Sequence, residues 1–137
     1  MKKIILAIIA VMVPLMLSAG STDFWFRHFS VEDGLSSSAV RAIMQDKYGF
    51  MWLGTDDGLN RYDGTTIKIY RLNPEGINDY ISFLYDTADR IWIGTGDGVY
   101  IYDYETENFE PFKLLTAKGD SIKTNVNHIA EDRDGNL

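Results

Sequence analysis

Short apolar runs broken by Asp-Gly turns occupy most of the chain after residue 21 and predict β-strands. One group of runs spans residues 40–45, 50–55, 59–62 and 66–70, and a second spans residues 80–85, 90–95, 99–102 and 108–112. Asp-Gly between such runs indicates hairpins, because both turn positions need a positive φ that Asp tolerates and Gly adopts freely. No stretch beyond the N-terminal segment repeats its apolar residues with the 3.6-residue period of a helix. The chain is therefore predicted to be all-β.

The two groups of strands carry the same motif. Residues 52–58 read WLGTDDG and residues 92–98, which lie 40 positions later, read WIGTGDG. Aligning residues 43–63 with 83–103 gives identity at eight of 21 positions. A fixed period near 40 residues, built from four short strands, is typical of a β-propeller blade. The repeated framework pairs are Asp46 with Asp86, Trp52 with Trp92, Gly54 with Gly94, Thr55 with Thr95, and Gly58 with Gly98.

Both faces of the strand expected over residues 50–55 are apolar. Phe50 and Trp52 alternate with Met51 and Leu53. A sheet with one wet face would alternate apolar and polar residues, so this strand belongs in a sheet that is covered on both sides. We predict an incomplete β-propeller of two four-stranded antiparallel blades with flanking strands. The two tryptophans are expected to fill equivalent buried places between blades rather than to bind a ligand.

The flanks predict further parts of the same fold. Residues 24–29 match the outer strand of a blade, and a third copy of the repeat supplies one inner strand that carries Asn127 and His128, and continues from Ile129 through Asp132 and Gly135. Propellers typically have 4–8 blades. We therefore expect these two and a half blades to be the N-terminal fragment of a longer protein. The alternative is a complete chain that closes its ring by oligomerising.

The N-terminus and the composition indicate export. Met1-Lys2-Lys3 precedes an uncharged stretch over residues 4–17 and then small residues, which is the pattern of a signal peptide over residues 1–21. The remaining domain, residues 22–137, would then lie in the periplasm. The absence of cysteine excludes disulfides and a lipoprotein anchor. A net charge of −7 without a basic cluster argues against nucleic acid as a partner.

Residues 34–64 read GLSSSAVRAIMQDKYGFMWLGTDDGLNRYDG and resemble the two-component regulator propeller repeat. The second repeat departs from the family pattern at residues 78–81 and at Asp89. The resemblance implies the periplasmic sensor region of a hybrid two-component histidine kinase of the Bacteroidetes type, which responds to oligosaccharides. It also implies that the remaining blades and the downstream sensor domains are partners of this segment. A homodimeric parent and a sensor region that feeds a diguanylate cyclase both remain open.

Catalytic and metal chemistry find little support in the sequence. The acidic turns lack the calcium-binding pattern of an EF-hand, and Asp is favoured in turns because its side chain bonds its own backbone. His28 and His128 lie far apart, and Ser36-Ser37-Ser38 lacks the G-x-S-x-G arrangement of a nucleophile elbow. We therefore expect no metal, no cofactor and no enzyme activity in this segment. The alternative is an exported propeller enzyme that resembles a polysaccharide lyase.

A ligand site should break the symmetry of the repeats. Loops on a rigid scaffold often carry function, and the inner strands and the loops that feed them line the end of a propeller channel. At matched inner-strand places the three copies carry Arg41, Ile81 and Asn127, followed by Ala42, Ser82 and His128. The predicted ligand-binding residues are Arg41, Tyr80, Asn127 and His128.

Overall fold

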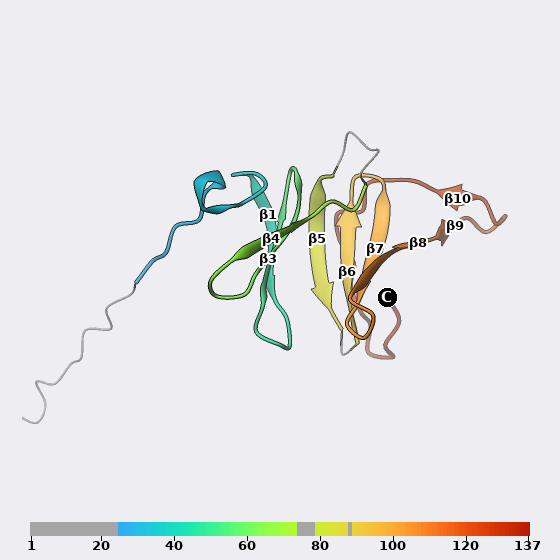
Figure 1. Cartoon of the computed structure of the whole chain (residues 1–137). Helices are drawn as coiled ribbons and strands as arrows, with labels where there is room; N and C mark the ends of the chain where they lie inside the picture. The colour runs from blue at the N-terminus through green and yellow to red at the C-terminus, as the bar shows by residue number, and fades with distance from the viewer. Residues whose placement is uncertain (1–24, 74–78, 88) are drawn as a thin grey trace, which may run out of the picture.

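The computed structural model describes residues 25–73, 79–87 and 89–137, so the predicted signal peptide lies outside the described residues. Two four-stranded antiparallel sheets stand side by side, each with its strands in chain order (Figure 1). The first sheet, blade 1, contains β1 (Val40–Gln45), β2 (Met51–Thr55), β3 (Gly58–Tyr62) and β4 (Ile67–Tyr70). The second, blade 2, contains β5 (Ile81–Asp86), β6 (Arg90–Thr95), β7 (Gly98–Asp103) and β8 (Asn108–Phe112). The predicted all-β propeller architecture is thereby confirmed.

Few other elements accompany the two blades. Within the described residues, one 3-10 turn, η1 (Val31–Asp33), precedes blade 1, and the short strands β9 (Leu114–Leu115) and β10 (Ser121–Ile122) pair after blade 2. Over the three described ranges, no helix is long and apolar enough to cross a membrane. The β9–β10 pair was not predicted from the sequence, because two-residue strands leave too short a pattern to detect.

The tight turn between the second and third strands is built identically in both blades. The Thr55 hydroxyl donates to the Gly58 carbonyl at 3.0 Å and accepts from the Asp57 amide at 3.1 Å. In blade 2, the Thr95 hydroxyl makes the same two bonds at 3.1 and 3.2 Å. Gly58 has φ 109°, a conformation that residues with a side chain rarely adopt. The Thr and Gly of the repeated motif are therefore turn-forming residues.

Glycine in the second strand allows one blade to approach the next. A Cβ added to Gly54 would lie 2.6 Å from Cγ2 of Ile81, the first residue of β5. A Cβ added to Gly94 would lie 2.6 Å from the Val126 carbonyl oxygen. The Val126 amide also donates to the Thr95 carbonyl at 3.2 Å, so the segment after β10 lies against blade 2 as β5 lies against blade 1. The 40-residue repeat therefore fixes the spacing between blades.

The core lies between the two blades, and the two tryptophans are not equally buried in it. Trp52 is fully buried, with its ring 5.1 Å from that of Tyr102 and 5.8 Å from that of Tyr70. Trp92 occupies the matching place in blade 2 but is only half-buried, with the Phe112 ring 5.1 Å away. Equivalent buried places were predicted: the places are equivalent in the two sheets, but Trp92 is not fully buried. A complete blade covers the Trp52 face, whereas a short segment of chain covers the Trp92 face.

The inner strands of the two blades are related by 41 residues, not by the 40 that the motif suggests. Trp52 pairs with Met44, whereas Trp92 pairs with Tyr85. The reason is the turn between the first and second strands, which is one residue shorter in blade 2: Asp46 N donates to Phe50 O, but Thr87 N donates to Arg90 O. Thr87, and not Asp86, therefore takes the place of Asp46.

Two flanking strands predicted from the sequence do not form. Residues 25–29 and 125–129 have no strand assignment, and Trp25 is 93% exposed. A strand needs a paired neighbour for its backbone groups, and no strand in the described ranges pairs with either segment. The third turn does form as predicted. Asp132 accepts the amides of Asp134 and Asn136 at 2.9 Å each, as Asp46 does in blade 1.

Candidate functional site

The structure brings two of the four predicted ligand residues together. Arg41 lies on β1, and its guanidinium carbon is 4.7 Å from the ring centroid of Tyr80, which directly precedes β5. Arg41 is the extra residue of a β-bulge between Val40 and Ala42, and bulges commonly redirect a side chain. The bulge places Arg41 at the end of the blades that carries the β2–β3 and β6–β7 turns, which we call the β2–β3 end.

An ion pair holds Arg41 in place. Its guanidinium donates to both carboxylate oxygens of Asp56, with Nη2 to Oδ2 at 3.2 Å. This hydrogen bond raises the pKa of Arg41 and lowers the pKa of Asp56. The side chains are 48% and 39% exposed, so solvent screens the pair and its contribution to stability is small. The pair orients the guanidinium and leaves it accessible at the surface.

The other two predicted residues lie on the segment that follows β10. The His128 ring is 5.6 Å from the Phe83 ring, and Asn127 is exposed. The Ser82 hydroxyl bonds the Val126 carbonyl, which ties this segment to β5. Among the described residues, Arg41 contacts Asp56 and Tyr80, and no hydrogen bond or ring contact joins it to Asn127 or His128. The register makes Ser82, and not Ile81, the counterpart of Arg41 in blade 2, because Ser82 is the extra residue of the matching bulge.

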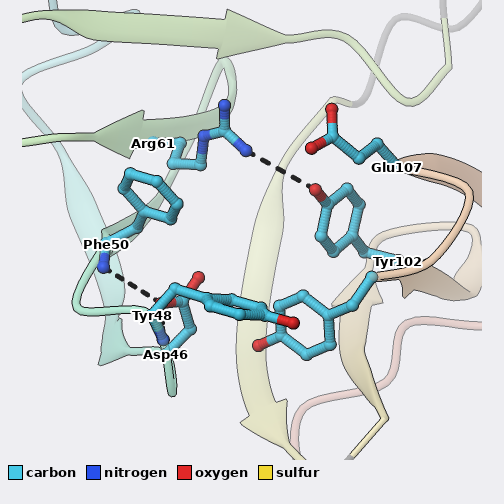
Figure 2. Close-up of a pocket in the computed structure, with 7 residues that line it drawn as sticks. Asp46, Tyr48, Phe50, Arg61, Tyr102 and Glu107 are labelled. Atoms are coloured by element: carbon cyan, nitrogen blue, oxygen red, sulfur yellow. Dashed lines mark hydrogen bonds between the residues drawn. The ribbon is translucent and has the colours of Figure 1, made fainter.

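A second concave site lies at the opposite end, between the two blades, and we call it the interblade pocket. Its volume is about 280 Å³. Blade 1 and its first turn contribute Tyr48, Phe50 and Arg61, and Figure 2 shows them facing Tyr102 and Glu107 of blade 2. Asp46 and Tyr104 complete the lining.

Aromatic rings and charged groups alternate around the interblade pocket. The Arg61 guanidinium carbon lies 4.7 Å from the Phe50 ring centroid, and Arg61 Nη1 donates to the Tyr102 hydroxyl at 3.5 Å (Figure 2). The Tyr104 hydroxyl donates to Asp86 at 2.8 Å. Burial, followed by this hydrogen bond, raises the pKa of Tyr104. Burial is also the main cause that raises the pKa of Tyr102. Both tyrosines are therefore neutral donors at physiological pH.

The interblade pocket was not predicted from the sequence, although a signal for it was present. Arg61 pairs with Trp52 in blade 1, and Ile101 pairs with Trp92 in blade 2. An arginine thus replaces an apolar residue at a matched position that faces the neighbouring blade. The same departure from the repeat that marks Arg41 on the first strand therefore also marks Arg61 on the third strand.

A related hollow of about 530 Å³ lies one blade further on, where Asp86, Arg90 and Trp92 face Glu131. Glu131 also accepts a hydrogen bond from the Tyr85 hydroxyl at 2.8 Å. Over residues 25–73, 79–87 and 89–137, no group of three or more His, Asp or Glu side chains is arranged to hold a metal ion. The acidic residues of this hollow instead have partners within the protein: Asp89 pairs with Arg90, Glu131 accepts from Tyr85 and Asp86 accepts from Tyr104.

Comparisons with known proteins agree with the fold. Residues 34–57 match the family model described as the two component regulator propeller. A stretch of 59 residues is 56% identical to Histidine kinase P4 of Formosa agariphila and covers 43% of this chain and 4% of that protein. A crystal structure of the extracellular domain of BT3049 from B. thetaiotaomicron, described as a hybrid two component system, aligns with TM-score 0.67 at 30% identity. The alignment covers 80% of this chain and 16% of that chain.

The paired blades and their shared turns define a propeller-type fold, the class to which the strand topology assigns this chain. The chain carries the two-component regulator propeller repeat at residues 34–57, so the resemblance predicted from the sequence is confirmed. Its relatives are a histidine kinase and the extracellular domain of a hybrid two component system. The chain spans only a small fraction of the length of both relatives.

Proposed function

We propose that this chain forms the N-terminal part of the periplasmic, ligand-binding propeller of a hybrid two-component sensor histidine kinase. The observation that carries the proposal is the 56% identity to a histidine kinase over 59 residues. The extracellular location of the structural neighbour supports it further. In this role the chain is a binding module and leaves catalysis to domains elsewhere in the sensor.

We propose an oligosaccharide as the ligand and the β2–β3 end as the place where it binds. Tyr80 supplies an aromatic face for a sugar ring, and Arg41 supplies guanidinium donors for hydroxyl or carboxylate oxygens. The Arg41–Asp56 pair holds those donors in a fixed orientation, which reduces the entropy lost on binding. Asn127 and His128 offer further polar groups on the adjoining segment. Ligand binding would then shift the equilibrium between signalling states of the sensor.

Calorimetry on the intact protein that carries this chain tests the proposal with a panel of oligosaccharides. Arg41→Ala should weaken binding of a recognised oligosaccharide about ten- to hundredfold, because a charge-assisted hydrogen bond contributes about 1.5–3 kcal/mol. Lys68→Ala, an exposed change on β4, is the control and should leave the affinity unchanged. If a folded Arg41→Ala protein binds the oligosaccharide with unchanged affinity, Arg41 does not contribute to the binding site. Failure of every oligosaccharide to bind would overturn the sensing proposal.

Product analysis distinguishes the proposed binding module from the alternative, an exported polysaccharide-degrading enzyme. Incubation of the intact protein with the same carbohydrates should give binding without shortened products. Release of shorter or unsaturated sugars, abolished by a substitution within this chain, would favour the enzyme.

A further inference from the structure

We propose that the interblade pocket binds a small neutral polyhydroxylated ring, such as a cyclic polyol or a single monosaccharide unit. The pocket lies at the end of the blades opposite to Arg41, so this inference does not rest on the proposed function. It rests on two charged groups that the fold leaves available on either side of an aromatic surface.

Arg61 is the first of these groups. It is half-buried, and none of the carboxylates in the described residues lies within ion-pair distance of it. Its hydrogen bond to the Tyr102 hydroxyl, at 3.5 Å, is at the outer limit of such bonds. A guanidinium has five N–H donors, so Arg61 keeps donors for a ligand oxygen.

Glu107 is the second group. It projects from the β7–β8 turn on the blade 2 side of the pocket, across from Arg61 (Figure 2). Its φ of 53° is the positive value of a left-handed residue, which non-glycine residues adopt infrequently. Within the described ranges its carboxylate accepts no hydrogen bond and forms no ion pair. Glu107 therefore supplies a free acceptor opposite a free donor.

The remaining carboxylate of the pocket is already occupied. Asp46 Oδ1 accepts the amides of Tyr48 and Phe50 at 2.9 and 3.0 Å. Asp46 Oδ2 accepts the indole N–H of Trp52 at 2.7 Å. These three donors satisfy the carboxylate and leave it little capacity for a ligand. Recognition thus falls to Arg61, Glu107 and the aromatic rings.

The balance of charges selects a neutral ligand. An anion drawn to Arg61 would meet Glu107 and Asp46, and a cation drawn to Glu107 would meet Arg61. Lys47 lies beside the same rings, with its ammonium 4.4 Å from the Tyr104 ring centroid, and adds a second positive charge against a cation. Adjacent hydroxyl groups can accept from Arg61 and donate to Glu107 together.

The shape of the pocket selects a single ring. A volume of about 280 Å³ is at the small end of ligand pockets, which range over roughly 300–1,000 Å³. The exposed Tyr48 ring and the half-buried Phe50 ring offer apolar surface to the C–H face of a cyclic polyol. Since Arg61 belongs to blade 1 and Glu107 to blade 2, a bound ring would join the two blades.

The test is a calorimetric and thermal-shift titration of the intact protein with myo-inositol and glucose. Glucuronate and glucosamine serve as charged analogues of the same size. We expect one or both neutral rings to bind and to raise the melting temperature, because a ligand that binds only the folded state stabilises it. The charged analogues should bind at least about tenfold more weakly, as one mismatched charge in a polar site predicts.

Two substitutions locate the binding. Arg61→Ile installs the residue that blade 2 has at the matched position, and Glu107→Gln keeps the shape of an exposed turn residue. Each should weaken the neutral rings about tenfold, whereas Arg41→Ala at the other end should not. If Arg61→Ile fails to fold, Glu107→Gln carries the test. Binding that is absent, that favours a charged analogue, or that is unchanged in Glu107→Gln would overturn the proposal.

Discussion

The carboxylate of Asp46 accepts the indole N–H of Trp52 at 2.7 Å, and this bond is buried between the blades. The other oxygen of the same carboxylate accepts the amides of Tyr48 and Phe50, which close the β1–β2 turn. One side chain therefore shapes the turn and also fixes the ring that fills the space next to blade 2. Bonds to an ionised acceptor are stronger than neutral ones, so this connection should be a main determinant of stability in blade 1.

Asp46→Asn tests this connection with little change in shape. Asn can still accept the two amides, but its NH₂ group would face the indole N–H and leave a buried donor without an acceptor. We expect a loss of about 1–3 kcal/mol in the free energy of unfolding. Denaturant unfolding of the intact protein measures it. Asp134→Asn, the same change at an exposed turn residue, is the control, and equal losses in the two variants would contradict the prediction.

Trp52→Ala and Trp92→Ala should differ in cost although both remove the same residue of the repeat. Trp52 is fully buried among aromatic rings, so its loss should cost about 3–5 kcal/mol. Trp92 is half-buried and should cost clearly less in the chain described here. Thermal or denaturant melts of the two variants decide the point. A Trp92→Ala protein that is at least as unstable as Trp52→Ala would show that the two environments are equivalent after all.

Gly54→Ala should force the blades apart. The added Cβ would lie 2.6 Å from Ile81 Cγ2 and 2.9 Å from Ile81 Cβ, and overpacking of this kind costs about 1–3 kcal/mol. Combining it with Ile81→Ala removes Cγ2, the nearer of the two atoms, and keeps only the 2.9 Å approach to Cβ. The double variant should therefore lose less stability than the two single losses added together. If the two losses are strictly additive in a double-mutant cycle, the contact between position 54 and Ile81 does not set the distance between the blades.

Much of the fold was accessible from the sequence because each cue is local. The Asp-Gly turns, the apolar second strand and the repeated Trp-x-Gly-Thr motif predicted eight strands within a residue or two of their observed ends. The register between the first and second strands of each blade was harder to predict from the sequence. Alignment on Trp52 and Trp92 also aligned Asp46 with Asp86, and only the pairing of backbone groups shows that the turn is one residue shorter in blade 2.

The candidate site was predictable only in part, for a related reason. Arg41 and Tyr80 stood out because they break the repeat, and the structure places them in contact. The interblade pocket needs residues from strands that are distant in sequence, such as Arg61 and Glu107. Its two walls meet only through packing of one blade on the next, which a pattern within one repeat does not describe.

Acid should weaken the protein through its turn aspartates, and Asp63 is the clearest case. The backbone amide of Thr66 and the hydroxyl and amide of Thr65 donate to its carboxylate and hold its pKa well below the usual range. A carboxyl whose pKa is lower in the folded state stabilises the fold above the unfolded pKa, about 3.9 for Asp. That contribution disappears as the pH falls from about 4 toward the lower folded value.

Unfolding curves at pH 7 and pH 3 check this behaviour. The protein should be less stable at pH 3, and Asp63→Asn should reduce the difference between the two conditions, because Asn does not titrate. An Asp63→Asn protein with the same acid sensitivity as the parent chain would contradict the assignment to this turn.

The shorter first turn of blade 2 has a practical consequence for anyone who recombines such repeats. Successive residues of a strand point to opposite faces, so an exchange of inner strands by the 40-residue motif spacing would insert each side chain one position out of phase. Arg41 would be replaced by Ile81, although Ser82 is the residue that occupies its bulge. A chimaeric or consensus blade should therefore exchange the inner strand and its following turn as one cassette, with the junctions placed before Val40 and after Phe50.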